Sequence, residues 1–331
     1  MSLIEELSVI YYLGMYVFAF TWPMVLVLFF LLIPSSTIPF FISLWMCYFL
    51  FIYLDRHTST TGGRARNHWA LSLFPQTLHH VRYFPLKVVK TAELPPTTNY
   101  LVGLHPHCPW TINGMHSLSD ENPLANELFP NVSRQLVTKP SFFWVPWSRE
   151  YTLFKGLISC NRTSMEYVLK KPPSGGKSKA LMVFVGGGRE AYYAAPRSMK
   201  VILKRQHGFV RLALRHGTPL VPVITFGEND IYHRVQSKLM VKLEQAIFSF
   251  TTKYGFGFAL FYGRFGTLMP FAKPITTVVG QPIPVQKWTL SDTPPIEQVE
   301  KVLSIYCDEL RKLYDDHKHD YGYGDVPLEI I

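Results

Sequence analysis

Apolar residues dominate the first sixth of the chain. From Val9 to Leu54 no Asp, Glu, Lys or Arg occurs. At about 1.5 Å per helical residue, this run is long enough to cross a hydrocarbon core of about 30 Å twice. Two prolines and three hydroxyl residues in IPSSTIP, residues 33–39, predict a turn in its middle. The pattern predicts a membrane hairpin within residues 1–57, with helices at about 9–33 and 38–54.

Charges near this apolar segment distinguish a retained hairpin from a cleaved signal peptide, and its prolines bear on how the hairpin crosses the membrane. Glu5 and Glu6 have the wrong charge for the leading region of a cleaved signal peptide, and the apolar run is too long for one. Pro23 is expected to kink the first arm, and the second arm is short. A re-entrant pair of helices therefore stays open beside the retained hairpin.

Positive charges follow the hairpin closely. Arg56, Arg64 and Arg66 place the large remainder of the chain in the cytosol by the positive-inside tendency. Two N-glycosylation sequons begin at Asn131 and Asn161, and they would be modified only if this side were lumenal. The sequons therefore provide a test of topology.

Residues 58–331 alternate strand and helix signals, which is typical of an α/β domain. Three apolar runs, Tyr100–Leu104, Ala180–Val185 and Pro219–Phe226, predict buried strands. Residues 208–217 place apolar side chains at helical spacing and end at a glycine, which predicts a helix. We expect one catalytic domain in this part of the chain.

Two further segments stand out near the C-terminus. Residues 254–271 hold seven aromatic residues, four glycines and one charge, so they are too interrupted for a transmembrane helix. Their rings suit a membrane interface or a greasy surface beside the site, and plain core is an equal alternative. Ile296–Tyr314 follows two prolines and has apolar residues at helical spacing, which predicts a closing helix.

The net charge of +10 is concentrated in one region of the chain. Between Glu190 and Glu228 there are six cations and no acidic residue. No recognised nucleic-acid-binding motif occurs, so acidic headgroups or phosphorylated lipid-like substrates are the expected anionic partners. A solvated helix face is the structural alternative. The six cations are Arg197, Lys200, Lys204, Arg205, Arg211 and Arg215.

The four cysteines are widely spaced and form no CxxC pair. Neither a disulfide framework nor a zinc site is indicated, which agrees with a cytosolic domain. No metal and no cofactor is expected. The cysteines are Cys47, Cys108, Cys160 and Cys307.

The first candidate site is HPHCP, residues 105–109, at the end of a predicted strand. Its prolines restrict the backbone, and alternate residues of an extended chain face opposite ways, so His105 and His107 should not share one role. Neutral imidazole, with an ordinary pKa of about 6.5, is a competent base at cytosolic pH. One histidine is expected to act as a base and the other to support it.

The second candidate site is the glycine block after the next predicted strand. Gly186, Gly187 and Gly188 allow a ligand to approach the backbone closely, and their N–H groups suit an oxyanion or a phosphate. Arg189 and Glu190 follow, and Glu190 is a candidate partner for the histidine base. This block does not match the P-loop sequence pattern.

Other interpretations of HPHCP stay open. A metal site would use His105, His107 and Cys108, but the histidines face opposite ways and no second ligand cluster exists. A thiol hydrolase would use Cys108 as a nucleophile activated by a histidine. Histidines that merely satisfy a tight turn are the structural alternative.

Several motifs together resemble the diacylglycerol acyltransferase 2 family, which includes monoacylglycerol and wax-alcohol acyltransferases. The resemblance covers about residues 80–285 and the leading hairpin. Its pieces are YFP at 83–85, HPH at 105–107, GGGREA at 186–191, RQHGFVRLALRHGTPLVPVITFGE at 205–228 and VGQPI at 279–283.

This resemblance implies a glycerolipid-acyltransferase-like domain at residues 58–331, with a mixed central sheet flanked by helices. It implies transfer of a fatty acyl chain from acyl-CoA, the co-substrate, to diacylglycerol or a related lipid alcohol, without a covalent intermediate. The implied location is the endoplasmic reticulum membrane and lipid droplets. In wider relatives an aspartate follows the histidine closely, whereas here no carboxylate follows before Asp120, which favours Glu190 as the orienting group.

The resulting hypothesis gives each candidate residue a role. His107 acts as the base, Glu190 orients it, and His105 supports it or donates to the oxyanion, although the two histidine roles are interchangeable. The Gly186–Gly188 backbone is the alternative oxyanion donor. Arg189, together with Arg205 and Arg211 of the basic run, is expected to contact the CoA phosphates.

One position departs from the family pattern. Cys108 stands where the family has glycine, and that glycine is needed if the position has a positive φ or if the acyl chain needs the room. An inactive lipid-droplet protein of the same fold is therefore an alternative to an active enzyme. Monoacylglycerol and fatty alcohols are alternative acceptors.

Overall fold

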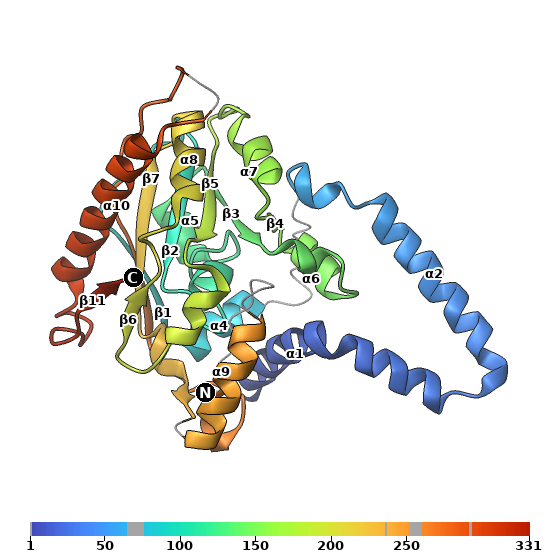
Figure 1. Cartoon of the computed structure of the whole chain (residues 1–331). Coiled ribbons are helices and arrows are strands. Elements are labelled where there is room, and N and C mark those ends of the chain that lie inside the picture. Colours follow the sequence, from blue (N-terminus) through green and yellow to red (C-terminus); the bar gives the residue numbers. More distant parts are fainter. Residues whose placement is uncertain (1, 65–75, 236, 252–259, 291–292) are drawn as a thin grey trace.

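The computed structural model of the chain covers both the apolar segment and the α/β domain (Figure 1). Two sequence expectations reach outside the described residues: Arg66 and residues 254–259 of the aromatic stretch. The described ranges are 2–64, 76–235, 237–251, 260–290 and 293–331.

Helices and strands alternate along the described domain. The α-helices are α1 Leu3–Leu32, α2 Ile38–Leu54, α4 Gln76–Tyr83, α5 Pro123–Leu128, α6 Ser148–Phe154, α7 Arg162–Leu169, α8 His207–His216, α9 Lys238–Thr251 and α10 Ile296–His317. The strands are β1 Leu86–Lys90, β2 Tyr100–His105, β3 Val132–Thr138, β4 Ile158–Ser159, β5 Ser178–Phe184, β6 Met199–Val201, β7 Leu220–Phe226, β8 His233–Arg234, β9 Phe261–Tyr262, β10 Ile275–Val279 and β11 Leu328–Ile330.

Seven strands form the central sheet in the order β1-β10-β7-β2-β5-β3-β4. β2 occupies its middle and runs parallel to both neighbours, β5 and β7. β10 is antiparallel to β7, so the sheet is mixed, as expected. The three predicted strands are confirmed as β2, β5 and β7, and every residue of β2 and β7 is buried because helices cover both faces.

Two hydrophobic cores lie on opposite faces of this sheet. On one face, α7, α8 and α10 pack through residues such as Leu212 and Tyr306. On the other face, the start of α1, α4 and the turn around Met115 pack against β2 and its neighbours. The predicted helix at 208–217 is α8, which ends at Gly217 with φ of 64°, a conformation that favours glycine. The predicted closing helix is α10.

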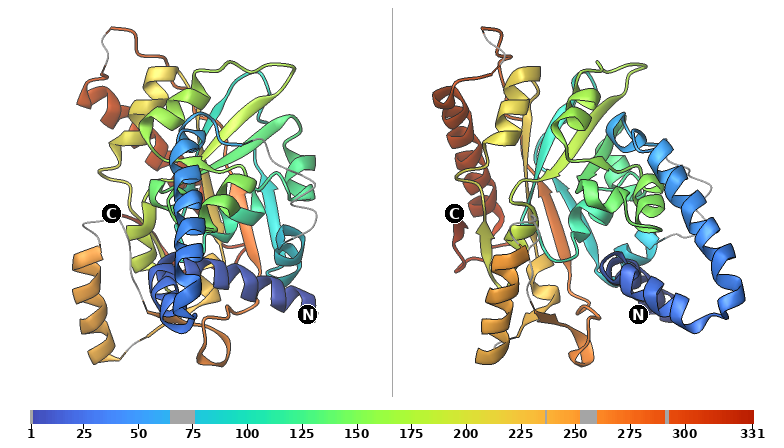
Figure 2. Two further views of the ribbon diagram at one scale, coloured as in Figure 1. Left: turned by 90° about the vertical axis from the view of Figure 1, so that its right-hand side faces the viewer. Right: turned by 45° about the vertical axis from the view of Figure 1, so that its right-hand side comes forward.

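The apolar segment folds as two helices that project from one side of the domain, opposite α10 (Figures 1 and 2). Among the described residues, the helical stretch Ser35–Thr60 is long and apolar enough to cross a membrane, with a mean hydropathy of 1.9. Thr21–Leu32 is a shorter apolar helix. α2 spans the residues expected for the second helix, whereas α1 begins six residues before the start expected for the first.

Part of the first arm, α1, packs against the domain, which the sequence did not predict. Its beginning packs on the domain, because Val9, Tyr12 and Leu13 are buried in the core beside α4. The Tyr12 hydroxyl donates to the backbone oxygen of Trp110, at 2.9 Å. Large apolar side chains are exposed along both halves of α1, from Leu3 and Ile4 to Leu31 and Leu32. Hydrophobicity alone does not distinguish a helix face that packs on protein from one that meets lipid.

Ion pairs join the end of α2 to α6. The guanidinium of Arg149 is almost fully buried and pairs with both Asp55 and Glu150. Arg64 contacts the same two carboxylates, with N–O distances of 2.7 Å to Asp55 and 3.3 Å to Glu150. The chain that leaves α2 is therefore fixed to the domain at this point.

Candidate active site

Three parallel strands bring the candidate residues to one edge of the sheet. HPHCP begins at His105, the last residue of β2, and the glycine block follows β5. Glu228 comes two residues after β7, on the other side of β2. Because parallel strands end at the same edge, polar side chains after β7, β2 and β5 converge there. The sequence prediction named two of these three segments as catalytic.

His105 is fully buried and faces the helix layer on the α10 side of the sheet. Its Nε2 lies 3.0 Å from the Tyr306 hydroxyl, which comes from α10. Gly103 makes this contact possible, because a Cβ there would lie 2.0 Å from the Tyr306 oxygen. Burial lowers the pKa of His105 to about 3, so the ring is neutral. This geometry suits a supporting role.

His107 differs from His105 in partner and in exposure. It is only partly buried, and its ring meets the Phe184 ring edge to face, with centroids 4.8 Å apart. Its Nδ1 is buried and has no hydrogen-bond partner among the described residues. Burial lowers the pKa of His107 to about 4. The two histidines have separate environments, as their alternation along the strand predicts.

Glu190 lies buried beside the histidine turn. Its carboxyl fits over Gly186, where a Cβ would lie 1.6 Å from Oε2. Neither carboxyl oxygen has a hydrogen-bond partner among the described residues, and no bond joins it to the His107 ring. Burial raises the pKa of Glu190 to about 8, against the opposing effect of the backbone N–H groups of His107 and Ile202. The Glu190 carboxyl therefore lies beside the backbone of the His107 segment and not beside its ring nitrogens.

Gly186, Gly187 and Gly188 begin the short 3-10 helix Gly187–Tyr193. Gly187 has φ of 61°, in the left-handed region that glycine tolerates, and nothing lies within 4 Å of a Cβ built there. Gly186 has an ordinary φ of −72°, so its lack of a side chain serves the fit of Glu190 and not the backbone.

Cys108 is fully buried, and its thiol donates to Asn229 Oδ1 at 2.8 Å. Burial raises the pKa of the Cys108 thiol well above its usual value, and Glu228 and Glu190 add to the shift. A nucleophilic cysteine needs the opposite environment. Cys108 is also absent from the non-glycine residues with positive φ. The backbone at this position therefore does not require the glycine of the family pattern.

Sequence reasoning missed two residues of this site. Glu228 is fully buried, and its Oε1 accepts from the Asn113 N–H at 3.2 Å while Oε2 has no partner among the described residues. Burial raises its pKa to about 8. A polar residue after a buried strand is a signal that identifies Glu228 from sequence. Tyr306 has no such signal, because it lies 201 residues from His105.

The basic residues divide into paired and unpaired groups. Arg197 pairs with Asp325, Lys200 with Glu329 and Arg215 with Glu166. Within the described ranges, none of the three cations predicted to contact CoA has a carboxylate partner. Arg189 and Arg205 are exposed near the carboxyl ends of the strands, and Arg211 is half-buried on α8. Lys204 of the basic run likewise has no carboxylate partner in the described ranges. The three cations predicted to contact CoA are Arg189, Arg205 and Arg211.

The described part of the chain contains no group of three or more His, Cys, Asp or Glu side chains placed to hold a metal ion. The groups that converge are a partly buried imidazole, a fully buried imidazole in contact with a tyrosine, and two buried carboxyls. At pH 7 the pKa values leave all four groups largely neutral. Neutral imidazoles can accept protons, and protonated carboxyls can donate them.

Comparisons with known proteins identify the family of the chain. The chain matches the diacylglycerol acyltransferase family over residues 35–330. Human acyl-CoA wax alcohol acyltransferase 1 is 36% identical over 318 residues, covering 92% of this chain and 93% of the relative. Human 2-acylglycerol O-acyltransferase 1 is 35% identical over 288 residues, covering 85% and 83%.

Among solved structures, the 1-acyl-sn-glycerophosphate acyltransferase PlsC from Thermotoga maritima aligns with a TM-score of 0.39 and 13% identity, over 80% of this chain and 87% of that chain. The resemblance inferred from the short motifs is confirmed by the family match and by relatives along nearly the whole sequence. The chain belongs to the diacylglycerol acyltransferase family and is an acyl-CoA-dependent acyltransferase.

Proposed function

We propose that the protein transfers a fatty acyl group from acyl-CoA to the hydroxyl of diacylglycerol, with His107 as general base. Membership of the family supports the donor and the reaction class. The two human relatives are named for wax alcohols and for 2-acylglycerols, so fatty alcohols and monoacylglycerol are the alternative acceptors.

The observation that carries the assignment of the base is the difference between the two histidines. His105 is fully buried, and its Nε2 is occupied by Tyr306. His107 is partly exposed at the carboxyl edge of the central strand. A general base must reach within about 3 Å of the proton it removes, directly or through one water. His107 meets this requirement better than His105.

The chemistry begins with a thioester, which is already an activated acyl donor. His107 accepts the proton of the lipid hydroxyl as its oxygen attacks the thioester carbonyl. The tetrahedral oxyanion then collapses, the carbon–sulfur bond breaks, and the imidazolium returns the proton to the CoA sulfur. Positioning of the two reactants and stabilisation of the oxyanion are therefore the protein's main contributions.

The surrounding residues tune these steps. Glu190, which its raised pKa of about 8 keeps largely protonated at pH 7, would orient the histidine turn by packing beside it. The Gly186–Gly188 backbone or His105 would donate to the oxyanion. Arg189, Arg205 and Arg211 would contact the CoA phosphates, which is supported by their lack of carboxylate partners in the described residues.

The proposed location is the endoplasmic reticulum membrane and lipid droplets, with residues 58–331 in the cytosol. The apolar helical stretch Ser35–Thr60 supports membrane association. Asn131 and Asn161 are exposed, so both sequons would be accessible to glycosylation if the domain were lumenal. We expect no mobility shift on treatment with a glycosidase, and a shift would reverse the topology.

The test of the base uses membranes that contain the native protein, His107→Ala or His57→Ala. His57 is an exposed histidine and serves as the matched control. Loss of a general base is expected to lower acyl transfer by about 100- to 10,000-fold, while His57→Ala stays active. Labelled acyl-CoA is supplied with each acceptor in turn, and triacylglycerol, diacylglycerol and wax ester are resolved. If His107→Ala keeps more than a tenth of the native rate, the proposed base is wrong.

A further inference from the structure

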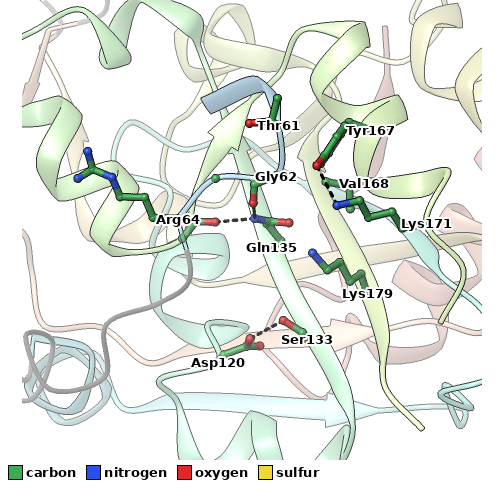
Figure 3. Close-up of a pocket in the computed structure, with 12 residues that line it drawn as sticks. Thr61, Gly62, Arg64, Asp120, Ser133, Gln135, Tyr167, Val168, Lys171 and Lys179 are labelled. Carbon is green, nitrogen blue, oxygen red and sulfur yellow. Dashed lines mark hydrogen bonds between the residues drawn. The ribbon is translucent and has the colours of Figure 1, made fainter. Parts of the chain in front are cut away.

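A polar cavity of about 450 Å³ lies away from the catalytic edge of the sheet. Its walls come from the segment after α2, from β3 and β5, and from α7, as Figure 3 shows. Lys179 is the second residue of β5, whereas the glycine block follows the other end of that strand. At about 3.3 Å per residue, the two ends are roughly 16 Å apart along the strand. The cavity is therefore separate from the active site.

Positive charge faces this cavity. Figure 3 shows the side chains of Lys171 and Lys179 pointing into the same space. The Lys171 ammonium donates to the Tyr167 hydroxyl at 2.9 Å, and it has no carboxylate partner among the described residues. The one carboxylate in the lining, Asp120, lies 3.2 Å from the buried guanidinium of Arg134 and accepts from its backbone N–H. The cavity therefore favours an anion.

A buried amide in the cavity wall indicates that the bound group should also donate a hydrogen bond. Gln135 is 8% exposed, and its Nε2 donates to the backbone oxygens of Gly62, at 3.1 Å, and Gly156, at 2.9 Å. These two acceptors fix the orientation of the amide, because a flipped amide would place oxygen against oxygen. Its Oε1 lines the cavity side and has no hydrogen-bond partner in the described residues. A bound molecule that donates a hydrogen bond to Oε1 would remove the free-energy cost of burying this acceptor without a partner.

The position of the cavity relates it to the membrane. Thr61, Gly62, Gly63 and Arg64 line it directly after the apolar helical stretch Ser35–Thr60. Arg64 is fixed by its contacts with the carboxylates at the end of α2 and the start of α6. Residues at the end of a spanning helix lie at headgroup depth. Phosphates and polyol hydroxyls are the groups found at that depth.

We propose that this cavity binds the headgroup of an acidic membrane lipid in which a phosphodiester carries free hydroxyls, such as a glycerol or inositol headgroup. The phosphate accepts from Lys171 and Lys179, and a hydroxyl donates to Gln135 Oε1. A choline headgroup carries a phosphate, but it has no donor and its cation opposes the lysines. The site is distinct from the proposed catalytic residues, so binding and acyl transfer are separately measurable.

The experiment measures bound lipid by native mass spectrometry of the full-length protein in detergent. Dioleoylphosphatidylglycerol is titrated against dioleoylphosphatidylcholine with the native protein, Lys171→Ala and Lys170→Ala. Lys170 is the adjacent lysine, has a side chain that is 66% exposed, and reaches Glu166, outside the cavity. Since a lysine near an acidic lipid contributes about 1 kcal/mol, Lys171→Ala should weaken phosphatidylglycerol binding about fivefold. Lys170→Ala should leave it unchanged.

Competition experiments identify whether the bound phosphate belongs to a membrane lipid or to a soluble molecule. Glycerophosphoglycerol, inorganic phosphate and CoA are each tested as competitors of the lipid. If glycerophosphoglycerol or inorganic phosphate binds as tightly as the lipid, the site serves a soluble phosphate and the membrane source is overturned. Displacement by CoA that is weakened in Lys171→Ala would make the cavity part of the acyl-donor site. Equal losses in Lys170→Ala and Lys171→Ala, or equal binding of phosphatidylcholine, would also refute the proposal.

Discussion

Gly186→Ala tests whether the position of Glu190 matters for catalysis. The backbone at Gly186, with φ of −72° and ψ of −18°, suits alanine, so the substitution adds no backbone strain. The new Cβ would instead lie 1.6 Å from Glu190 Oε2 and 2.7 Å from its Cδ. An ordinary contact begins at 3.4 Å, so the carboxyl or the turn must move by about 1.8 Å. Glu190 is 1% exposed, so its carboxyl would have to move within the protein interior.

Two effects of different size follow from this clash. Overpacking of a buried site costs about 1–3 kcal/mol of stability. A misplacement of about 1 Å near reacting groups costs on the order of 100-fold in rate, so we expect acyl transfer to fall by at least that factor. The rate is measured with purified protein at saturating acyl-CoA, beside a thermal unfolding curve. The loss should appear mainly in kcat, because the acyl-CoA contacts are untouched.

Two glycine controls separate the clash from other consequences of alanine. Gly187→Ala introduces backbone strain at φ of 61° but meets no atom within 4 Å. Gly208→Ala introduces neither backbone strain nor a close contact. Gly208→Ala should keep most of its activity, whereas a loss of activity in Gly187→Ala would report strain in the proposed oxyanion-donor backbone. In the double variant of Gly186→Ala with Glu190→Ala, the clash partner is gone, so the double variant should be no slower than Glu190→Ala alone. Near-native activity in Gly186→Ala would refute a catalytic role for the position of Glu190.

The other expected outcomes concern the tyrosine, the cysteine and the second buried carboxyl. Tyr306→Phe leaves His105 Nε2 without its partner, so unfolding measurements should show a loss of about 1–3 kcal/mol, and an unchanged midpoint would remove the supporting role. Cys108→Ser keeps a donor for Asn229, so acyl transfer should survive it; abolished turnover would instead reveal a thiol nucleophile. Glu228 keeps its proton to a pKa of about 8 when folded but only to 4.5 when unfolded, so its contribution to stability is present below pH 4.5 and is lost as the pH rises through 8. The upper bound of this loss is about 5 kcal/mol, and Glu228→Gln should flatten the pH dependence of the unfolding midpoint between pH 5 and 8.

The elements that the sequence predicts well are those whose signal is local. β2, β5 and β7 are continuous apolar runs, and α8 carries a helical period closed by a glycine. β10 has no comparable local signal for its place in the sheet, because it inserts between β1 and β7 although it follows β7 in the chain. Strand order depends on pairing between distant segments, which hydrophobic periodicity does not record.

The same distinction applies to the candidate site. HPHCP and the glycine block were predictable because polar residues that follow buried strands meet at one edge of the sheet. The partner of His105 was not predictable, since Tyr306 reaches it from the last helix of the domain. The orienting role of Glu190 was expected as a contact with the His107 ring, whereas the carboxyl in this structure has no hydrogen bond to it. Side-chain packing around Gly186, and not the motif, sets that geometry.

The first turns of α1 pack on the domain through Val9, Tyr12 and Leu13, and the rest of the helix projects away from it. Tyr12 holds the backbone at Trp110, three residues beyond His107. The beginning of α1 is therefore linked directly to the segment that carries the imidazole of His107, so a change in how α1 sits on the domain would reach the backbone of the proposed base.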